Sequence, residues 1–212
     1  MKKLFYSGLI FALLFFISFT AQAATYNFTQ YSANGNVDVS SQLSVDIIDN
    51  GIDGALFTFF NDVGIASSIT QVVFGDAVPL FSSIAYTGSF DGVNFSNSGT
   101  SGNDYGFNKT FASSTVSGTN DGVNAAGEWI SYTGIYDTNQ DYSTLLAAIL
   151  ADNFNIGLHI QSIGQAGGSE KYVMNDQPGP GGFGNPVPLP AALWLFGPAL
   201  LGFMGLRKKI KS

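Results

Sequence analysis

The chain has 212 residues, with 15 acidic and 8 basic side chains, one histidine, no cysteine and a formal net charge of −7. The lack of cysteine excludes disulfides, thiolate metal sites, a cysteine nucleophile and a cysteine-linked lipid anchor. A single histidine also excludes a metal site built from several imidazoles.

The first 23 residues have the order of a secretory signal peptide. Two lysines near the start precede an apolar stretch, and the small residues Ala21 and Ala23 follow it. This order predicts a signal peptide over residues 1–23, which signal peptidase cleaves after Ala23. An uncleaved N-terminal anchor is the alternative. We therefore expect the rest of the chain to be exported.

Residues 24–174 are expected to form one exported domain, which is long enough to bury a core without disulfides. Short runs rich in aromatic and β-branched residues alternate with clusters of Gly, Asn, Asp and Ser, a pattern typical of an all-β, antiparallel β-sandwich of jelly-roll-like form. The expected strands are Tyr26–Tyr31, Leu43–Ile48, Ala55–Phe60, Ile69–Phe74, Leu80–Phe90, Tyr105–Phe111, Trp129–Tyr136 and Phe154–Ile163.

Local signals refine this prediction. The run Ala55–Phe60 is apolar on both faces, which favours a central strand. Turns are expected at the Asp-Gly pairs 53–54, 91–92 and 121–122, because both residue types tolerate positive φ. One short helix is expected over Tyr142–Ala151, capped by Asp141, with one apolar face formed by Leu145, Leu146, Ile149 and Leu150.

The charge of the exported part differs from that of the whole chain. Only Lys109 and Lys171 lie in it, against all fifteen acids, which gives a formal charge of −13. Such a field repels nucleic acid and anionic lipid, so no nucleic-acid partner is expected. It favours solubility and attracts divalent cations or basic groups.

Candidate catalytic residues are few. His159 lies in the middle of an expected strand with no nucleophile motif beside it, and we assign it a structural or surface role. Glu128 and Glu170 are the only glutamates, and a glycosidase would need a pair of carboxylates. Trp129 could stack on a sugar ring or simply pack in the core. We predict no catalytic site.

Two loops concentrate oxygen ligands that calcium prefers. They are residues 49–54 and 137–141, with Asp49, Asp53, Asp137 and Asp141 as the carboxylates. Neither has the spacing of an EF-hand loop. Ordinary Asp/Asn turns are expected, no cofactor is predicted, and calcium in these loops stays open.

The C-terminal part has a spacer and a three-part signal. Residues 175–186 contain four glycines and three prolines, which predicts an extended linker. Val187, Pro188, Leu189, Pro190 and Ala191 then open an apolar run over 189–206, long enough to cross a bilayer. Arg207, Lys208 and Lys209 follow as a stop-transfer cluster that the positive-inside rule keeps cytoplasmic. A buried core helix with a charged tail is the alternative.

The segment 187–211, by its Val-Pro-Leu-Pro-Ala motif and the Leu-Trp-Leu-Phe-Gly run at 193–197, resembles the VPLPA-CTERM sorting signal, a variant of the PEP-CTERM signals of Gram-negative bacteria. The resemblance implies recognition by the membrane protease-transpeptidase exosortase. It also implies anchoring in the inner membrane before processing and delivery to the cell surface or the extracellular polysaccharide layer. A Gram-positive sortase signal has the same layout, but the Thr-Gly of its motif is missing after Leu189-Pro190.

Three hypotheses for function follow. The first is a non-enzymatic exported surface or matrix protein, processed by signal peptidase and exosortase. The second is a carbohydrate-binding surface module, with or without calcium, whose partner would be extracellular polysaccharide. The third, a secreted hydrolase, needs an acid–base cluster that the residue pattern does not indicate.

Overall fold

The computed structural model describes residues 23–51, 54–100, 102 and 104–178, with side chains up to Met174. All of these residues belong to one compact unit, Gln22–Val187. Residues 1–21 and 188–212 lie outside the described ranges. No helix within those ranges is long and apolar enough to cross a membrane.

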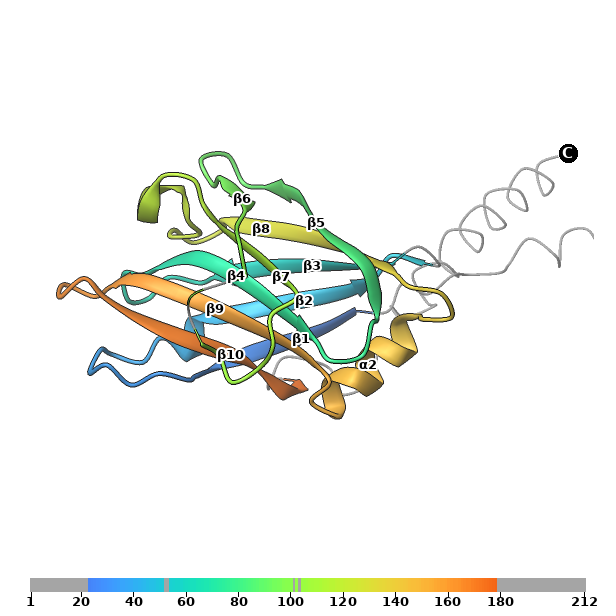
Figure 1. Cartoon of the computed structure of the whole chain (residues 1–212). Helices are drawn as coiled ribbons and strands as arrows, with labels where there is room; N and C mark the ends of the chain where they lie inside the picture. The colour runs from blue at the N-terminus through green and yellow to red at the C-terminus, as the bar shows by residue number, and fades with distance from the viewer. Residues whose placement is uncertain (1–22, 52–53, 101, 103, 179–212) are drawn as a thin grey trace, which may run out of the picture. The chain divides into compact units, whose positions relative to one another are not determined.

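The described residues form one antiparallel sheet (Figure 1). Its strands pair in the order β5-β8-β3-β2-β1-β10-β9-β4-β7-β6. In chain order they are β1 (Ala23–Gln30), β2 (Leu43–Asp49), β3 (Gly54–Asn61), β4 (Ser68–Asp76), β5 (Phe81–Ser89), β6 (Phe95–Asn97), β7 (Phe111–Thr115), β8 (Trp129–Tyr136), β9 (Phe154–Ile163) and β10 (Gly168–Pro178).

The sheet is rolled into a nearly closed, barrel-like form. The strands β5 and β6 stand at the two ends of the pairing order and nevertheless contact each other. Strand β5 pairs with β8 through a register that shifts twice, between Phe81 and Ser83 and between Tyr86 and Gly88. Such irregularities bend a strand and raise its twist, which lets the sheet curve toward closure.

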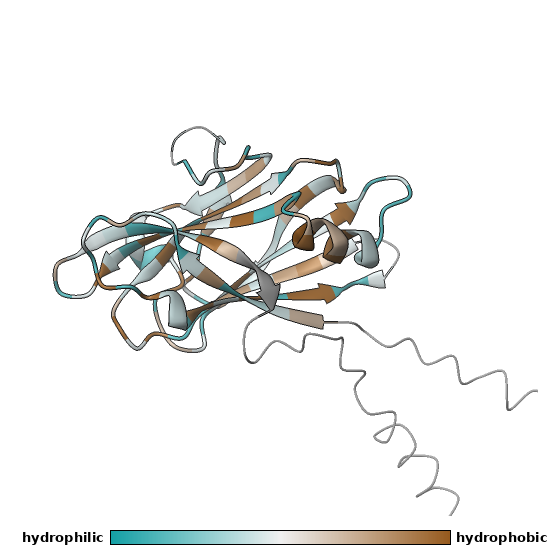
Figure 2. Cartoon of the chain, turned by 90° about the horizontal axis from the view of Figure 1, so that it is seen from below, coloured by the Kyte–Doolittle hydropathy of each residue, from teal (hydrophilic) through white to brown (hydrophobic). Residues whose placement is uncertain are grey.

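Aromatic rings fill the interior. Phe57 on β3 is fully buried, and its ring centroid lies 5.3 Å from that of Phe74 on β4 and 5.8 Å from that of Phe154 on β9. The Tyr132 ring on β8 also contacts the rings of Phe74 and Phe111. Burying one such ring stabilises the fold by about 1.5–3 kcal/mol. Figure 2 shows the hydrophobic residues concentrated in the strands and in α2.

The helix α2 (Tyr142–Leu150) follows the predicted signals. The Asp141 carboxylate accepts from the Thr144 backbone N–H at 2.8 Å, and the Thr144 hydroxyl accepts from the Asp141 backbone N–H, which completes a capping box. Leu145 and Ile149 are buried, whereas Leu150 is 58% exposed. Leu150, the last residue of the predicted apolar face, therefore does not belong to the core.

The prediction of an all-β antiparallel domain with one short helix is confirmed, and β3 is a central strand, paired with β2 and β8. The prediction of a strand over Tyr105–Phe111 is wrong, because residues 105–110 form a loop and β7 begins at Phe111. Strands β6 and β10 were not predicted. Strand β10 extends through Pro178, so the first residues of the expected linker belong to the sheet.

Of the three predicted turns, Asp91-Gly92 is confirmed, with φ of +93° at Gly92. Gly122 has φ of −85° at the end of the short 3-10 helix η3 (Gly118–Asp121), so it needs no positive φ. Gly54 lies in β3 rather than in a turn, and Asp53 lies outside the described residues.

Candidate functional site

The single histidine lies on the outer face of the sheet. His159 on β9 stands between Gln71 on β4 and Lys171 on β10 in the strand register. Burial lowers its pKa, and the charge of Lys171 lowers it further. The side chains beside His159 in the strand register are therefore an amide and an ammonium group. Neither activates its imidazole as a general base.

Both glutamates are engaged by the loops around them. Glu170 on β10 is 1% exposed and accepts five hydrogen bonds from the loop at 32–36, including 2.6 Å from the Ser32 hydroxyl and 2.7 Å from the Asn34 backbone N–H. Burial alone would raise its pKa, but these hydrogen bonds outweigh burial and leave the pKa below its usual range. Glu170 therefore fixes a loop in place.

Glu128 has a similar role before β8. Its Oε2 accepts from the backbone N–H groups of Asn124 at 2.6 Å and Ala125 at 2.9 Å, which closes the turn that precedes the strand. Trp129 is half-buried and lies against Gly88 of β5. The two glutamates thus belong to separate loops, each with its carboxylate turned onto local donors.

The carboxylates of the two calcium candidate loops also bind backbone groups. Asp49 accepts from the Gly51 N–H at 3.0 Å, and Asp137 accepts from the Thr138 N–H at 2.7 Å. Asp141 caps α2, and these hydrogen bonds lower its pKa. No group of three or more metal-binding side chains occurs among the described residues.

The predicted processing sites lie almost entirely outside the described residues. These are Ala21 of the signal-peptide site, the motif Val187–Ala191, the apolar run and the stop-transfer cluster. Ala23 is described, and it begins β1 opposite Ile48 of β2. A cleavage after Ala23 would therefore leave Ala24, opposite Ile47, as the first residue of the strand.

A loop packed on the outer face of the sheet builds the most distinctive surface feature. We call residues 104–110, which lead into β7, the strap loop. Tyr105 is 2% exposed and packs with Phe107 against Val73 of β4 and Val173 of β10. The Tyr105 hydroxyl donates to Oε1 of Gln71 at 3.2 Å.

Two strand glycines allow this close approach. A Cβ atom on Gly157 of β9 would lie 2.6 Å from Cδ1 of Tyr105, and one on Gly75 of β4 would overlap the Phe107 ring. Real side chains essentially never approach so closely. The backbone N–H of Thr110 donates to the carbonyl of Phe74 at 2.8 Å and fixes the end of the loop. The strap loop is therefore packed directly against the sheet.

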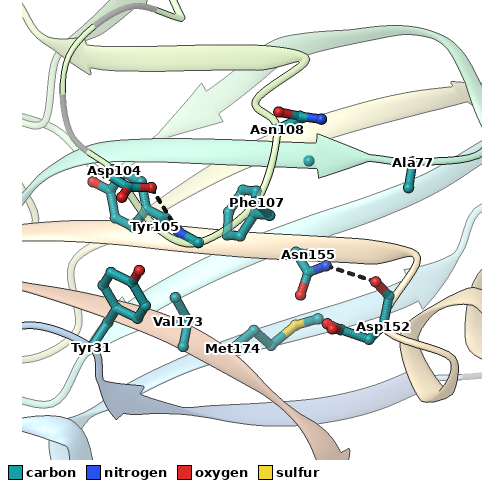
Figure 3. A pocket seen from close by; sticks show the side chains of 12 residues that line it. Tyr31, Ala77, Asp104, Tyr105, Phe107, Asn108, Asp152, Asn155, Val173 and Met174 are labelled. Carbon is teal, nitrogen blue, oxygen red and sulfur yellow. Dashed lines mark hydrogen bonds between the residues drawn. The ribbon is translucent and has the colours of Figure 1, made fainter.

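Between the strap loop and the strands β9 and β10 lies a groove of about 950 Å³, which we call the strap groove (Figure 3). Tyr31 follows β1, and its ring reaches the strap loop, where a Cβ atom on Gly106 would lie 3.1 Å from the Tyr31 hydroxyl oxygen. The residue is 45% exposed. The lining also includes Asp104, Phe107, Asn108, Asp152, Asn155 and Met174. An apolar floor with a few polar groups around it is the usual composition of a small-ligand or sugar site.

The charged lining of the strap groove is acidic. Asp104 accepts from the Gly106 backbone N–H at 2.9 Å, whereas no described residue donates a hydrogen bond to the Asp152 carboxylate. The Nδ2 of Asn155 donates to the Asp152 backbone carbonyl at 3.1 Å. The Lys171 side chain donates to the Asp104 backbone carbonyl at 3.1 Å but is not part of the lining.

A smaller groove of about 370 Å³ lies where β5 faces the start of β7. Asp76 lines it, and its Oδ2 accepts from the backbone N–H groups of Leu80 at 2.8 Å and Phe81 at 3.3 Å. Its Oδ1 is buried and has no hydrogen-bond partner. Burial raises the pKa of Asp76 despite the backbone hydrogen bonds that lower it. This carboxylate holds the turn between β4 and β5.

No protein-family model matches the chain, and neither a curated protein nor a solved structure matches it. The strap groove was not predicted from the sequence. The signal that could have indicated it is Gly106 between Tyr105 and Phe107, because a glycine with φ of +79° interrupts an otherwise strand-like aromatic alternation.

Proposed function

We propose that this is a non-enzymatic exported protein of the cell surface or extracellular matrix. In this proposal, signal peptidase removes residues 1–23 and exosortase acts on a VPLPA-CTERM signal at Val187–Ala191. The apolar segment 189–206 anchors the precursor in the inner membrane until then. The support is the order of residues at both ends and the resemblance of the C-terminal segment to that sorting signal.

The absence of enzymatic activity is supported by what the candidate catalytic residues do. Glu170 holds the loop at 32–36, Glu128 closes a turn, and His159 lies between Gln71 and Lys171 on the outer face. An acid–base pair needs two groups that converge on one substrate atom. Each of these side chains is instead used by its own part of the fold. We also infer that the domain is a β-sandwich of jelly-roll-like form. The support is that aromatic rings from β3 and β8 pack against rings from β4 and β9.

The test of processing uses the prolines of the motif. Proline fixes the backbone in an extended form that a membrane protease can reach, whereas alanine would let the apolar helix continue. Changing Pro188 and Pro190 together to Ala should therefore leave the protein in the inner-membrane fraction of its natural host, while the wild type reaches the surface. Equal surface delivery of both forms would contradict the role of the motif.

A second candidate function, polysaccharide binding, is favoured by the strap groove. An exposed aromatic ring, Tyr31, faces a lining that offers the amides of Asn108 and Asn155 and the carboxylates of Asp104 and Asp152. Sugar rings present apolar faces to aromatic side chains and hydroxyls to amides and carboxylates. The strap loop that carries Asp104 and Asn108 is packed on the sheet through Tyr105 and Phe107.

Binding of soluble polysaccharides to the purified full-length protein tests this candidate. Tyr31→Ala should weaken binding at least tenfold. The matched control Tyr86→Ala, which removes an exposed tyrosine on β5, should leave binding unchanged. Repeating the measurement with a chelator shows whether calcium contributes. Wild-type affinity in Tyr31→Ala would exclude the strap groove as the site.

A further inference from the structure

The end of α2 carries an unusual residue. Asp152 follows the helix with φ of +58°, in the left-handed region. Its backbone N–H donates to the carbonyl of Ile149 at 3.1 Å, and the N–H of Asn153 donates to the carbonyl of Ala148 at 2.8 Å. This pair of hydrogen bonds is the Schellman motif, in which the left-handed position is usually glycine.

Two local effects disfavour aspartate at this position. A β-carbon at positive φ is strained, although Asp and Asn tolerate it better than most residues. The C-terminus of a helix also carries partial negative charge, which repels a carboxylate. Neither helix propensity nor capping accounts for Asp152, and glycine would serve the helix end better.

The Asp152 carboxylate belongs to the strap groove. In Figure 3 it points toward Met174 on the groove floor, and no described residue donates a hydrogen bond to it. Asp104 supplies a second carboxylate at the strap loop. The backbone of Asp104 is bonded to the Lys171 side chain, and Lys171 pairs with His159, seven residues beyond Asp152. Figure 3 shows Asp104 and Asp152 at opposite ends of the groove.

This placement does not bring the two carboxylates together around one metal ion, whose oxygen ligands lie within about 2.6 Å of it. It suits an elongated ligand that meets one carboxylate at each end. No lysine, arginine or histidine is among the described residues that line the strap groove, so a polyuronate would meet the like charge of Asp104 and Asp152 there. A protonated amino group would instead gain a charge-assisted hydrogen bond from Asp152, a carboxylate to which no described residue donates.

We propose that the strap groove binds oligosaccharides of amino sugars with free, protonated amino groups, and that Asp152 is the carboxylate that selects them. This inference rests on the proposed polysaccharide binding and names its substrate class. The Asn108 and Asn155 amides serve the neutral hydroxyls, and Tyr31 packs on a ring face. Aspartate is kept at the helix end because its charge is used in the groove.

The test compares three short probes with the purified full-length protein at pH 6 and low salt: glucosamine trimer, its fully N-acetylated form and a uronic-acid trimer. Short probes limit non-specific attraction of a polycation to an acidic protein. We expect the free-amine trimer to bind at least tenfold more tightly than the acetylated trimer, with the preference shrinking as salt rises. The uronic-acid trimer should bind least.

Variants assign the preference to one carboxylate. Asp152→Asn and Asp152→Gly should each remove most of the preference, while Asp91→Asn, which deletes one exposed carboxylate in the β5–β6 turn, should retain it. Equal binding of the amine and acetylated trimers, or equal effects of Asp152→Asn and Asp91→Asn, would overturn the assignment of Asp152. Lack of binding by all probes and by longer polysaccharides would overturn polysaccharide binding itself.

Discussion

Asn34 binds both oxygens of the Glu170 carboxylate. Its backbone N–H donates to Oε1 at 2.7 Å, and its side-chain Nδ2 donates to Oε2 at 3.1 Å. Residues 136 apart in the sequence are thereby joined through a carboxylate that is almost fully buried on β10. The loop between β1 and η1 (Ser40–Gln42) is thus attached to the sheet by charge-assisted hydrogen bonds as well as by the buried side chain of Val39.

Replacing this carboxylate should weaken the fold. Glu170→Gln places an amide N–H₂ among groups that all donate, so at least one buried donor loses its acceptor. We expect the free energy of unfolding to fall by about 2–3 kcal/mol in chemical denaturation. Asp62→Asn, at an exposed position, serves as the control and should change it by less than about 0.5 kcal/mol. A Glu170→Gln effect as small as the control would contradict the role assigned to Glu170.

The stability difference between wild type and Glu170→Gln should also depend on pH. The folded-state pKa of Glu170 lies below its unfolded value, so its contribution is present above the unfolded pKa and is lost as pH falls through the folded pKa. The stability difference between wild type and Glu170→Gln should therefore shrink as pH falls from about 5 toward 2. A difference that stays constant over this range would show that the carboxylate charge is not used.

Asp76 should give the opposite slope. Burial raises its folded-state pKa, so the native state holds a proton more tightly than the unfolded chain does. Its contribution is complete below the unfolded pKa and is lost as pH rises through the folded pKa. Asp76→Asn should therefore gain stability relative to wild type as pH rises from about 3 to 6, whatever the constant offset from its altered hydrogen bonds. Urea titrations at several pH values measure this, and a relative loss would contradict the effect of burial.

The local signals predicted the helix and most strands, but not the parts of the fold made by distant residues. Asp141 and the apolar spacing after it define α2 within ten residues of sequence. Strand β10 was missed because Glu170 and Lys171 look like surface residues, and the donors that bury Glu170 come from the loop after β1. Nothing near Glu170 in the sequence indicates those partners.

The strap groove has the same origin. Tyr105 and Phe107 alternate as in a strand, yet their rings pack on the outer face of β4 and β9, over glycines far away in the sequence. Asp104 and Asp152 come from unconnected loops, and only the folded sheet places both in one lining. Residue patterns could therefore suggest sugar binding as a hypothesis but could not give its site.

The seating of the strap loop can be tested at Gly157. In Gly157→Ala, the added methyl group would press on Tyr105 and on Val73, so either the strap loop shifts or the strand distorts. We expect a loss of about 1–3 kcal/mol in unfolding free energy, together with faster proteolysis of the strap loop. Gly64→Ala is the matched control, since its nearest neighbour would be 3.8 Å away. Equal stability of the two variants would mean that the loop is not packed on Gly157.

Replacing Asp152 by glycine should make the fold more stable. Asp152→Gly relieves both the left-handed strain and the charge at the end of α2, so the free energy of unfolding should rise by about 0.5–1 kcal/mol. For a domain of this size the melting temperature should rise by about 1–4 °C, measured by thermal denaturation. Asp152→Ala removes the charge but keeps a β-carbon at positive φ, and should gain less. A melting temperature that falls in Asp152→Gly would show that aspartate serves the fold after all.

Export followed by processing at both ends can be tested by measuring the intact mass of the protein released at the cell surface of its natural host. We expect a species that begins at Ala24 and ends within or directly after Val187–Ala191, without the apolar segment and the basic cluster. A surface species that retains residues 1–23, or that retains Arg207–Lys211 outside the membrane, would contradict it.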